Sequence, residues 1–191
     1  YAFREEHPNV KFEFLQGTYY ELEEMILKGE INIALLAPVP KNSKRIKSSI
    51  LFTEKIVALI PKTHPLAKAE EIQLVDLRNE GLVLFPKGFV LRDLITNACQ
   101  QLGFQPNVAF EGEEITAITG LVAAGLGISL IPEFTIVDNV PRATVVKKIS
   151  FPEVTRTVGI AISTEQPLLP TEKIFYQFLH SYYEKLEHYN K

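Results

Sequence analysis

The chain has 191 residues, of which 46% are hydrophobic and 23% charged, a balance that indicates a globular protein and excludes a disordered one. Its 20 basic and 23 acidic residues give a formal net charge of −3 without a run of five basic residues, so the sequence lacks the electrostatic signature of a nucleic-acid-binding surface. One cysteine, Cys99, and no Asn-x-Ser/Thr sequence favour a reducing, cytoplasmic setting over a disulfide-linked secreted scaffold. Nothing at the start resembles a signal peptide, and no apolar run approaches the ~20 residues of a bilayer span, so we expect no membrane partner.

The first thirty residues predict a helix end, a strand and a second helix. Residues 1–6 are typical of a short helical tail, and the alternating apolar residues of 10–14 predict a strand. Thr18 and Glu21 have the spacing of a capping box at a helix start, and Gly29 stands where that helix would end.

Three further strands and a last helix follow from apolar runs and helical spacing. Residues 31–36 form a short apolar run that ends at Pro38, which is typical of a buried strand. The runs 52–61 and 157–162 predict two longer strands, and residues 175–186 have the apolar spacing of a helix.

Between the two longer strands, the pattern of the first forty residues recurs. Residues 91–102 predict a helix, 108–110 a strand, 115–125 a second helix that ends at its glycine, and 127–131 a buried strand that ends at Pro132. The motif Pro-Asn-Val-x-Phe opens the strand in both copies. The tripeptide alone could be a common way to leave a helix and start a strand, but the matching helix and strand that follow favour a structural repeat.

A strand, a helix and a buried second strand are typical of a parallel βαβ unit, so we expect an α/β fold with two Rossmann-like lobes. The two longer strands would cross between the lobes. Lobe I would contain residues 1–57 and the returning segment 160–191, and lobe II residues 58–159. Two such lobes would enclose a ligand cleft at the carboxyl ends of their strands.

Several motifs, in the right order over nearly the whole chain, resemble the effector-binding domain of LysR-type transcriptional regulators. The most specific are His-Pro-Leu-Ala at 64–67 and Gly-Leu-Val-Ala-Ala-Gly-Leu-Gly-Ile at 120–128. Residues 53–56 and 83–92 look closer still to the subgroup that governs glutamate synthesis in Gram-positive bacteria.

The resemblance implies a periplasmic-binding-protein-like fold of type 2 and a sensor that is not an enzyme. It also implies a homodimer through residues 2–14 and 91–110, a tetramer in the full-length protein, and DNA binding only through an amino-terminal winged helix-turn-helix. That domain and the first strand of the effector domain are not in this sequence.

Enzyme signatures are weak. No metal-ligand spacing links Cys99 with any of the four histidines, which are His7, His64, His180 and His188, or links the histidines with one another. We therefore expect no metal and no cofactor. Gly125 and Gly127 resemble the start of a dinucleotide-binding fingerprint, but they precede a predicted strand instead of following one. Leu130 also stands where the third glycine is needed, so we do not expect a dinucleotide site. A solute-binding protein of a transporter remains the alternative, since it shares the two-lobe fold.

The turn before residue 90 is the predicted anion site. Gly88 and Phe89 open a helix with no acidic residue before Asp93, so backbone N–H groups would be available to an anion. Arg92 could grip a carboxylate with two parallel bonds. Lys87 could contact the ligand or remain a solvated loop lysine, and Phe89 could pack against the hinge, stack on the ligand, or both.

The other predicted ligand-binding residues come from strand ends. Gln16, Gly17 and Thr18 offer backbone N–H groups and a hydroxyl, although Thr18 could act as a helix cap alone. The set is completed by Pro38, Pro132 and Glu111. The carboxylates of Glu111 and of the acidic residues after it would disfavour a ligand with a third negative charge. We therefore expect a small anionic effector, a short dicarboxylate such as 2-oxoglutarate, with one carboxylate at Gly88 and Arg92 and the other at Gly17 and Thr18.

Overall fold

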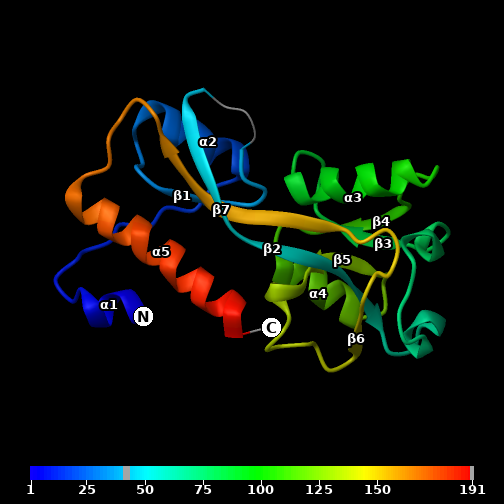
Figure 1. Cartoon of the computed structure of the whole chain (residues 1–191). Coiled ribbons are helices and arrows are strands. Elements are labelled where there is room, and N and C mark those ends of the chain that lie inside the picture. The colour runs from blue at the N-terminus through cyan, green and yellow to red at the C-terminus, as the bar shows by residue number, and fades with distance from the viewer. Residues whose placement is uncertain (41–43, 190–191) are drawn as a thin grey trace. The chain divides into compact units, whose positions relative to one another are not determined.

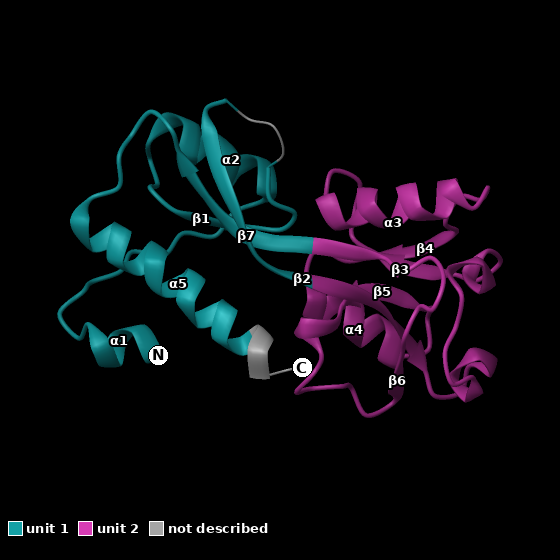
Figure 2. Cartoon of the chain, in the orientation of Figure 1, with its two compact units in different colours: residues 1–53, 157–191 teal, residues 54–156 magenta. Residues whose placement is uncertain are grey.

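The computed structural model describes residues 1–40 and 44–189, the side chains of 187–189 excepted. The chain divides into two compact units: unit 1 contains residues 1–53 and 157–191, and unit 2 contains residues 54–156 (Figure 2). Two strands, β2 (Ile46–Pro61) and β7 (Thr155–Ser163), pass from one unit into the other and are hydrogen-bonded neighbours.

Unit 1 is built on the strand pair β1 (Ala34–Leu36) and β7, which is antiparallel. Apolar clusters lie on both faces of this sheet. Helix α2 (Tyr19–Lys28) buries Ile26 against Ala34 and Ala161, whereas α5 (Pro170–Tyr189) packs Leu179 against Leu51 and Ile160. The expected cap residues of α2 are present: Thr18 and Glu21 form the capping box, and Gly29 ends the helix with a φ of 71°.

The short helix α1 (Ala2–Glu6) is held by an aromatic cluster in unit 1. The buried Phe3 ring contacts His7, Phe12, Phe175 and Phe178, with ring centroids between 4.7 and 5.5 Å apart. This cluster anchors the amino-terminal segment to α5.

The predicted strand at residues 10–14 is wrong. These residues pair with no strand in the described chain, and Phe14 is 79% exposed. An extended segment gains ladder hydrogen bonds only from a neighbouring strand. Phe12 packs against Phe3 and Phe175 instead. The first copy of the repeat is therefore not a parallel βαβ unit, because its only strand, β1, pairs antiparallel with β7.

The second copy does form a βαβ arrangement in unit 2. Strand β4 (Val108–Glu111) is parallel to β3 (Leu82–Leu84), and a parallel bridge joins Leu82 to Ile128 just before β5 (Ser129–Pro132). Strands β5 and β6 (Thr144–Lys147) pair antiparallel with β2. The strand β3 thus lies between β4 and the chain that enters β5.

The two long helices of unit 2 cover opposite faces of its sheet (Figure 1). Helix α3 (Val90–Gln101) buries Ile95 and Cys99 on one face, and α4 (Ile115–Ala123) buries Ile118 and Val122 on the other. The burial of a large aliphatic side chain such as Ile95 or Ile118 contributes roughly 1.5–3 kcal/mol to the stability of the fold. The position of α3, and with it the predicted anion site, is therefore fixed by core packing.

Three short 3-10 helices complete unit 2: Pro65–Lys68, Leu74–Leu77 and Glu133–Thr135. His64 caps the first of them, since its Nδ1 accepts a hydrogen bond from Leu66 N at 3.2 Å. The other ring nitrogen lies 3.1 Å from Glu80 Oε2. A close backbone approach also explains one glycine of the 120–128 motif: a Cβ on Gly127 would lie 2.5 Å from the Gly81 carbonyl oxygen.

Candidate functional site

The turn from β3 into α3 has the backbone conformation of an uncapped helix start. Gly88 adopts a φ of +95°, a conformation that favours glycine. Phe89 occupies the N-cap position, where its side chain makes no capping hydrogen bond. The first N–H groups of a helix lack partners within the helix and carry the positive end of its dipole. They are the kind of donors that bind an anion.

Arg92 lies in the first turn of α3 and is only 7% exposed. Its Nη1 donates to the Phe85 carbonyl at 2.8 Å and to Glu111 Oε1 at 3.2 Å. These two acceptors lie just after β3 and at the end of β4, so the guanidinium joins the helix start to the sheet. Within the described chain its Nε and Nη2 make no hydrogen bond, and neither is a fully buried atom. One edge of a buried guanidinium is therefore left for a partner.

The rings beside this turn form a small aromatic wall. Phe85 and Phe89 stack with centroids 5.1 Å apart and planes 25° apart. Lys87, between them in sequence, is exposed, and so is Gly88. The structure thus brings together Arg92, Glu111 and Phe89 around the end of β3.

Sequence reasoning did not single out Phe85 as part of the site. Its carbonyl holds Arg92 and its ring stacks on Phe89. The available signal was its position, since it directly follows a buried strand and precedes Pro86 at the carboxyl edge of a parallel sheet.

The predicted residues of unit 1 are differently disposed. Gln16, Gly17 and Thr18 are all exposed. Thr18 N and Oγ1 both donate to Glu21 Oε2, at 2.7 and 2.9 Å, and Thr18 Oγ1 accepts from Glu21 N at 3.4 Å. The N–H of Thr18, and then its hydroxyl, lower the pKa of the Glu21 carboxyl. These donors are therefore engaged by the helix's own carboxylate.

The two predicted prolines occupy strand ends in different units. Pro38 follows β1 in unit 1 and is joined to Ala37 by a cis peptide bond. Pro132 is buried at the end of β5 in unit 2, where its carbonyl accepts from Thr135 Oγ1 at 2.7 Å. Neither proline has a described hydrogen bond to Arg92 or Glu111.

The rest of the described chain offers few reactive centres. Among the described side chains of residues 1–40 and 44–186, no three His, Cys, Asp or Glu groups gather as they would around a metal ion. Burial raises the pKa of the Cys99 thiol to about 11, which disfavours the reactive thiolate. No helix in the same ranges combines the length and hydropathy of a membrane span.

Two compact units joined by the neighbouring strands β2 and β7 are the features that place the chain in a class of proteins. The model of the LysR substrate binding domain matches residues 1–184, and the chain belongs to this family. Its fold is accordingly the periplasmic-binding-protein-like fold of type 2 that LysR effector-binding domains share.

The individual relatives agree with this family. The chain is 50% identical over 188 residues to the transcriptional dual regulator GltC of Bacillus subtilis, an alignment that covers 98% of the chain and 63% of GltC. It is 34% identical to the HTH-type transcriptional regulator YybE of the same organism, covering 96% of the chain and 62% of YybE. The chain thus spans about three-fifths of the length of these curated relatives.

Solved structures show the same similarity. The effector-binding domain of QuiR, in complex with shikimate, superposes with a TM-score of 0.86 at 26% identity. The superposition covers 96% of this chain and 88% of the QuiR chain.

Proposed function

We propose that this chain is the effector-sensing part of a LysR-type transcriptional regulator and has no catalytic role. A small anionic metabolite binds at the amino end of α3 and shifts the equilibrium between conformations or assemblies that differ in their affinity for it. Membership of the family and the 50% identity to GltC support this proposal.

The half-satisfied guanidinium of Arg92 is the observation that carries the site. Nη1 has two described acceptors, whereas Nε and Nη2 have none and keep contact with solvent, so a ligand can reach them. The free edge of a guanidinium matches the two oxygens of a carboxylate, a pairing that contributes roughly 1.5–3 kcal/mol per hydrogen bond. The uncapped N–H groups of the same helix would add a second set of donors.

A carboxylate is the favoured chemistry of the effector. The ligand of the QuiR domain, shikimate, is itself a carboxylate. We propose 2-oxoglutarate as the first candidate, because the sequence resembles the glutamate-synthesis subgroup and GltC is a close relative. The Glu111 carboxylate beside Arg92 disfavours additional negative charge, so a tricarboxylate such as citrate should bind more weakly.

We further propose that the sensing part dimerises through residues 2–14 and 91–110. Both segments expose large apolar side chains: Phe14 is 79% exposed and Phe110 is 41% exposed. A two-fold pairing of these surfaces would bury both residues of each subunit. In the full-length protein the assembly would be a tetramer, and DNA would be bound only through an amino-terminal domain.

Titration calorimetry of the chain with 2-oxoglutarate, succinate, citrate and shikimate tests the proposed function. We expect saturable binding of at least one C4 or C5 dicarboxylate and weaker binding of citrate. A duplex DNA fragment in the same buffer should give no salt-sensitive binding, because the chain has too few clustered cations to release counterions. Absence of heat with every carboxylate would contradict the effector assignment, and sub-micromolar DNA binding would contradict the domain assignment.

A further inference from the structure

Unit 1 contains a cavity that is open at the surface and has no part in the α3 site of unit 2. Its volume is about 460 Å³, within the ~300–1,000 Å³ range of small-molecule sites. It lies between the start of β2, the end of β7 and the first turns of α5. The half-buried side chains of Ile162, Leu168 and Tyr176 supply apolar lining, and the exposed Lys47 and Lys173 border it.

The charge around this cavity is unbalanced. Within the described part of the chain, neither Lys47 nor Lys173 forms an ion pair, although two acidic residues lie on the adjoining loop and helix. Glu165 is engaged by Arg45, whose Nε and Nη2 donate to its two carboxylate oxygens at 2.7 and 3.0 Å. Glu172 accepts from Asn32 Nδ2 at 2.6 Å and from the backbone N of residue 169 at 2.7 Å. The acids are held elsewhere, and both ammonium groups remain available to a ligand.

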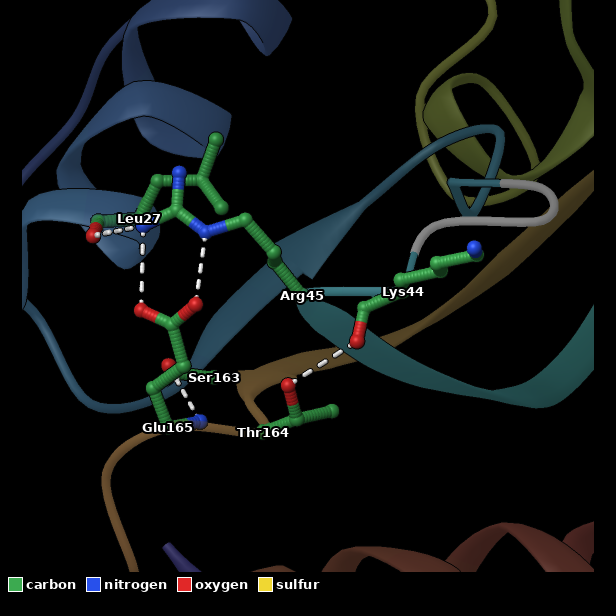
Figure 3. A network of polar contacts seen from close by, with 6 residues as sticks. All are labelled: Leu27, Lys44, Arg45, Ser163, Thr164 and Glu165. Carbon is green, nitrogen blue, oxygen red and sulfur yellow. Dashed lines mark hydrogen bonds and ion pairs between the residues drawn. The ribbon is translucent and has the colours of Figure 1, made fainter.

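Polar contacts tie the loop beside the cavity to α2 and to the start of β2 (Figure 3). Arg45 joins Glu165 to the end of α2, since its Nη2 also donates to the Leu27 carbonyl at 3.4 Å. Thr164 Oγ1 donates to the Lys44 carbonyl at 3.1 Å, which ties the same loop to the start of β2. A loop held by such contacts loses less conformational entropy when a ligand binds.

Tyr176, which lines the cavity from α5, has polar and aromatic contacts of its own. The Tyr176 hydroxyl lies 3.0 Å from Ser49 Oγ, which is also 2.9 Å from His180 Nε2. The rings of Tyr176 and His180 pack with centroids 4.8 Å apart. The aromatic ring that lines the cavity is therefore held by both hydrogen bonding and ring packing.

We propose that this cavity is a second ligand site, for a small organic carboxylate that carries an apolar body. The apolar part would contact Ile162, Leu168 and the Tyr176 ring, and the carboxylate would lie between Lys47 and Lys173. Neither the apolar lining alone nor the two lysines alone would select such a ligand, because the lining is neutral and the lysines are exposed. Their combination at one preformed cavity specifies an amphipathic anion.

Two-dimensional ¹H–¹⁵N NMR of the chain, titrated with phenylacetate and with its neutral isostere phenylacetamide, tests this site. We expect saturable shifts in the amide signals of Lys47, Ser163, Gln166 and Lys173 with phenylacetate, and binding at least about tenfold weaker with phenylacetamide. The double variant Lys47→Gln and Lys173→Gln should weaken phenylacetate binding by about tenfold or more. Lys185→Gln, an exposed lysine farther along α5, is the matched control and should leave the affinity unchanged.

Three results would overturn the proposal. The first is the absence of saturable shifts at these amides, and the second is equal affinity for phenylacetate and phenylacetamide. The third is unchanged affinity for phenylacetate in the double-lysine variant. The other amide signals in the spectrum of this variant show whether it is folded. Because the signals belong to unit 1, these results are independent of whether a carboxylate binds at Arg92 in unit 2.

Discussion

Arg92 Nη1 lies 3.2 Å from Glu111 Oε1, so the first turn of α3 and the end of β4 share an ion pair. The arginine side chain is 9% exposed and the glutamate side chain 46% exposed. The pair is therefore buried on the cation's side and solvated on the anion's side. Glu111 reduces the net charge that the arginine presents to a ligand, while the Phe85 carbonyl keeps the guanidinium in place.

Removing the negative charge of this pair should strengthen anion binding. Glu111→Gln is expected to raise carboxylate affinity about 1.4- to fivefold, since a partly exposed charge interaction is worth ~0.2–1 kcal/mol. Glu70→Gln, at an exposed residue on a different loop of unit 2 and without a described partner, is the control for net charge. Calorimetry measures both. Equal affinities in the two variants would show that Glu111 does not act on the ligand site.

The capping box of α2 should contribute stability that depends on pH. Thr18→Ala should lower the free energy of unfolding of unit 1 by about 1 kcal/mol at neutral pH. Because the folded-state pKa of Glu21 is lowered, its stabilising effect is present above the ordinary carboxyl pKa and is lost as pH falls through the folded value. Urea unfolding should therefore separate wild type from Glu21→Gln at pH 7 and not in acid. A difference between them that grows as pH falls would contradict this assignment.

Ser129 should be replaceable at no cost. Its Oγ is the one fully buried side-chain polar atom without a hydrogen-bond partner in the described chain, and the residue is 0% exposed. A buried unpaired polar group costs roughly 1–3 kcal/mol, so Ser129→Ala should leave the stability of unit 2 unchanged or raise it by about 1 kcal/mol. Thermal or urea unfolding measures the change. A clear loss of stability would mean that the hydroxyl has a partner.

Dimerisation should depend on exposed apolar residues of the two proposed segments. Light scattering at tens of micromolar should report a dimer, and Phe14→Glu or Phe110→Glu should shift it toward monomer. Phe151→Glu, at a residue that is 62% exposed and outside both segments, should have no effect. A monomer in wild type, or dissociation by Phe151→Glu instead, would argue for a different assembly.

Local signals predicted the helices well. The capping pair Thr18 and Glu21, the terminal Gly29 and the apolar spacing of residues 91–102 are all short-range features, and the structure has helices in these places. The prediction of a strand at 10–14 failed because alternating apolar residues indicate only an extended backbone. A strand also needs a neighbouring strand to which it can hydrogen-bond. The antiparallel pairing of β1 with β7 was missed because it joins residues more than a hundred positions apart.

The residue types of the candidate site were predictable from the sequence, but their hydrogen-bond partners were not. The turn at Gly88 and the arginine after it follow from local helix-start chemistry, and both lie at the α3 start. The bond between Arg92 and Glu111 depends on the parallel register of β3 with β4, which the sequence does not reveal. Thr18 offers the same donors to a ligand or to Glu21, and only the structure shows that Glu21 takes them.

The affinity of Arg92→Ala for 2-oxoglutarate is the most direct test of the proposed sensor site. Lys68→Ala, an exposed lysine of unit 2, removes the same charge away from the turn and is the matched control. Circular dichroism and thermal unfolding would establish that both variants are folded, since loss of the Phe85 bond should cost only about 1–3 kcal/mol. We predict that calorimetry will show binding about tenfold weaker, or more, in Arg92→Ala and unchanged in Lys68→Ala. Unchanged affinity in a folded Arg92→Ala variant would contradict the placement of the anion at α3.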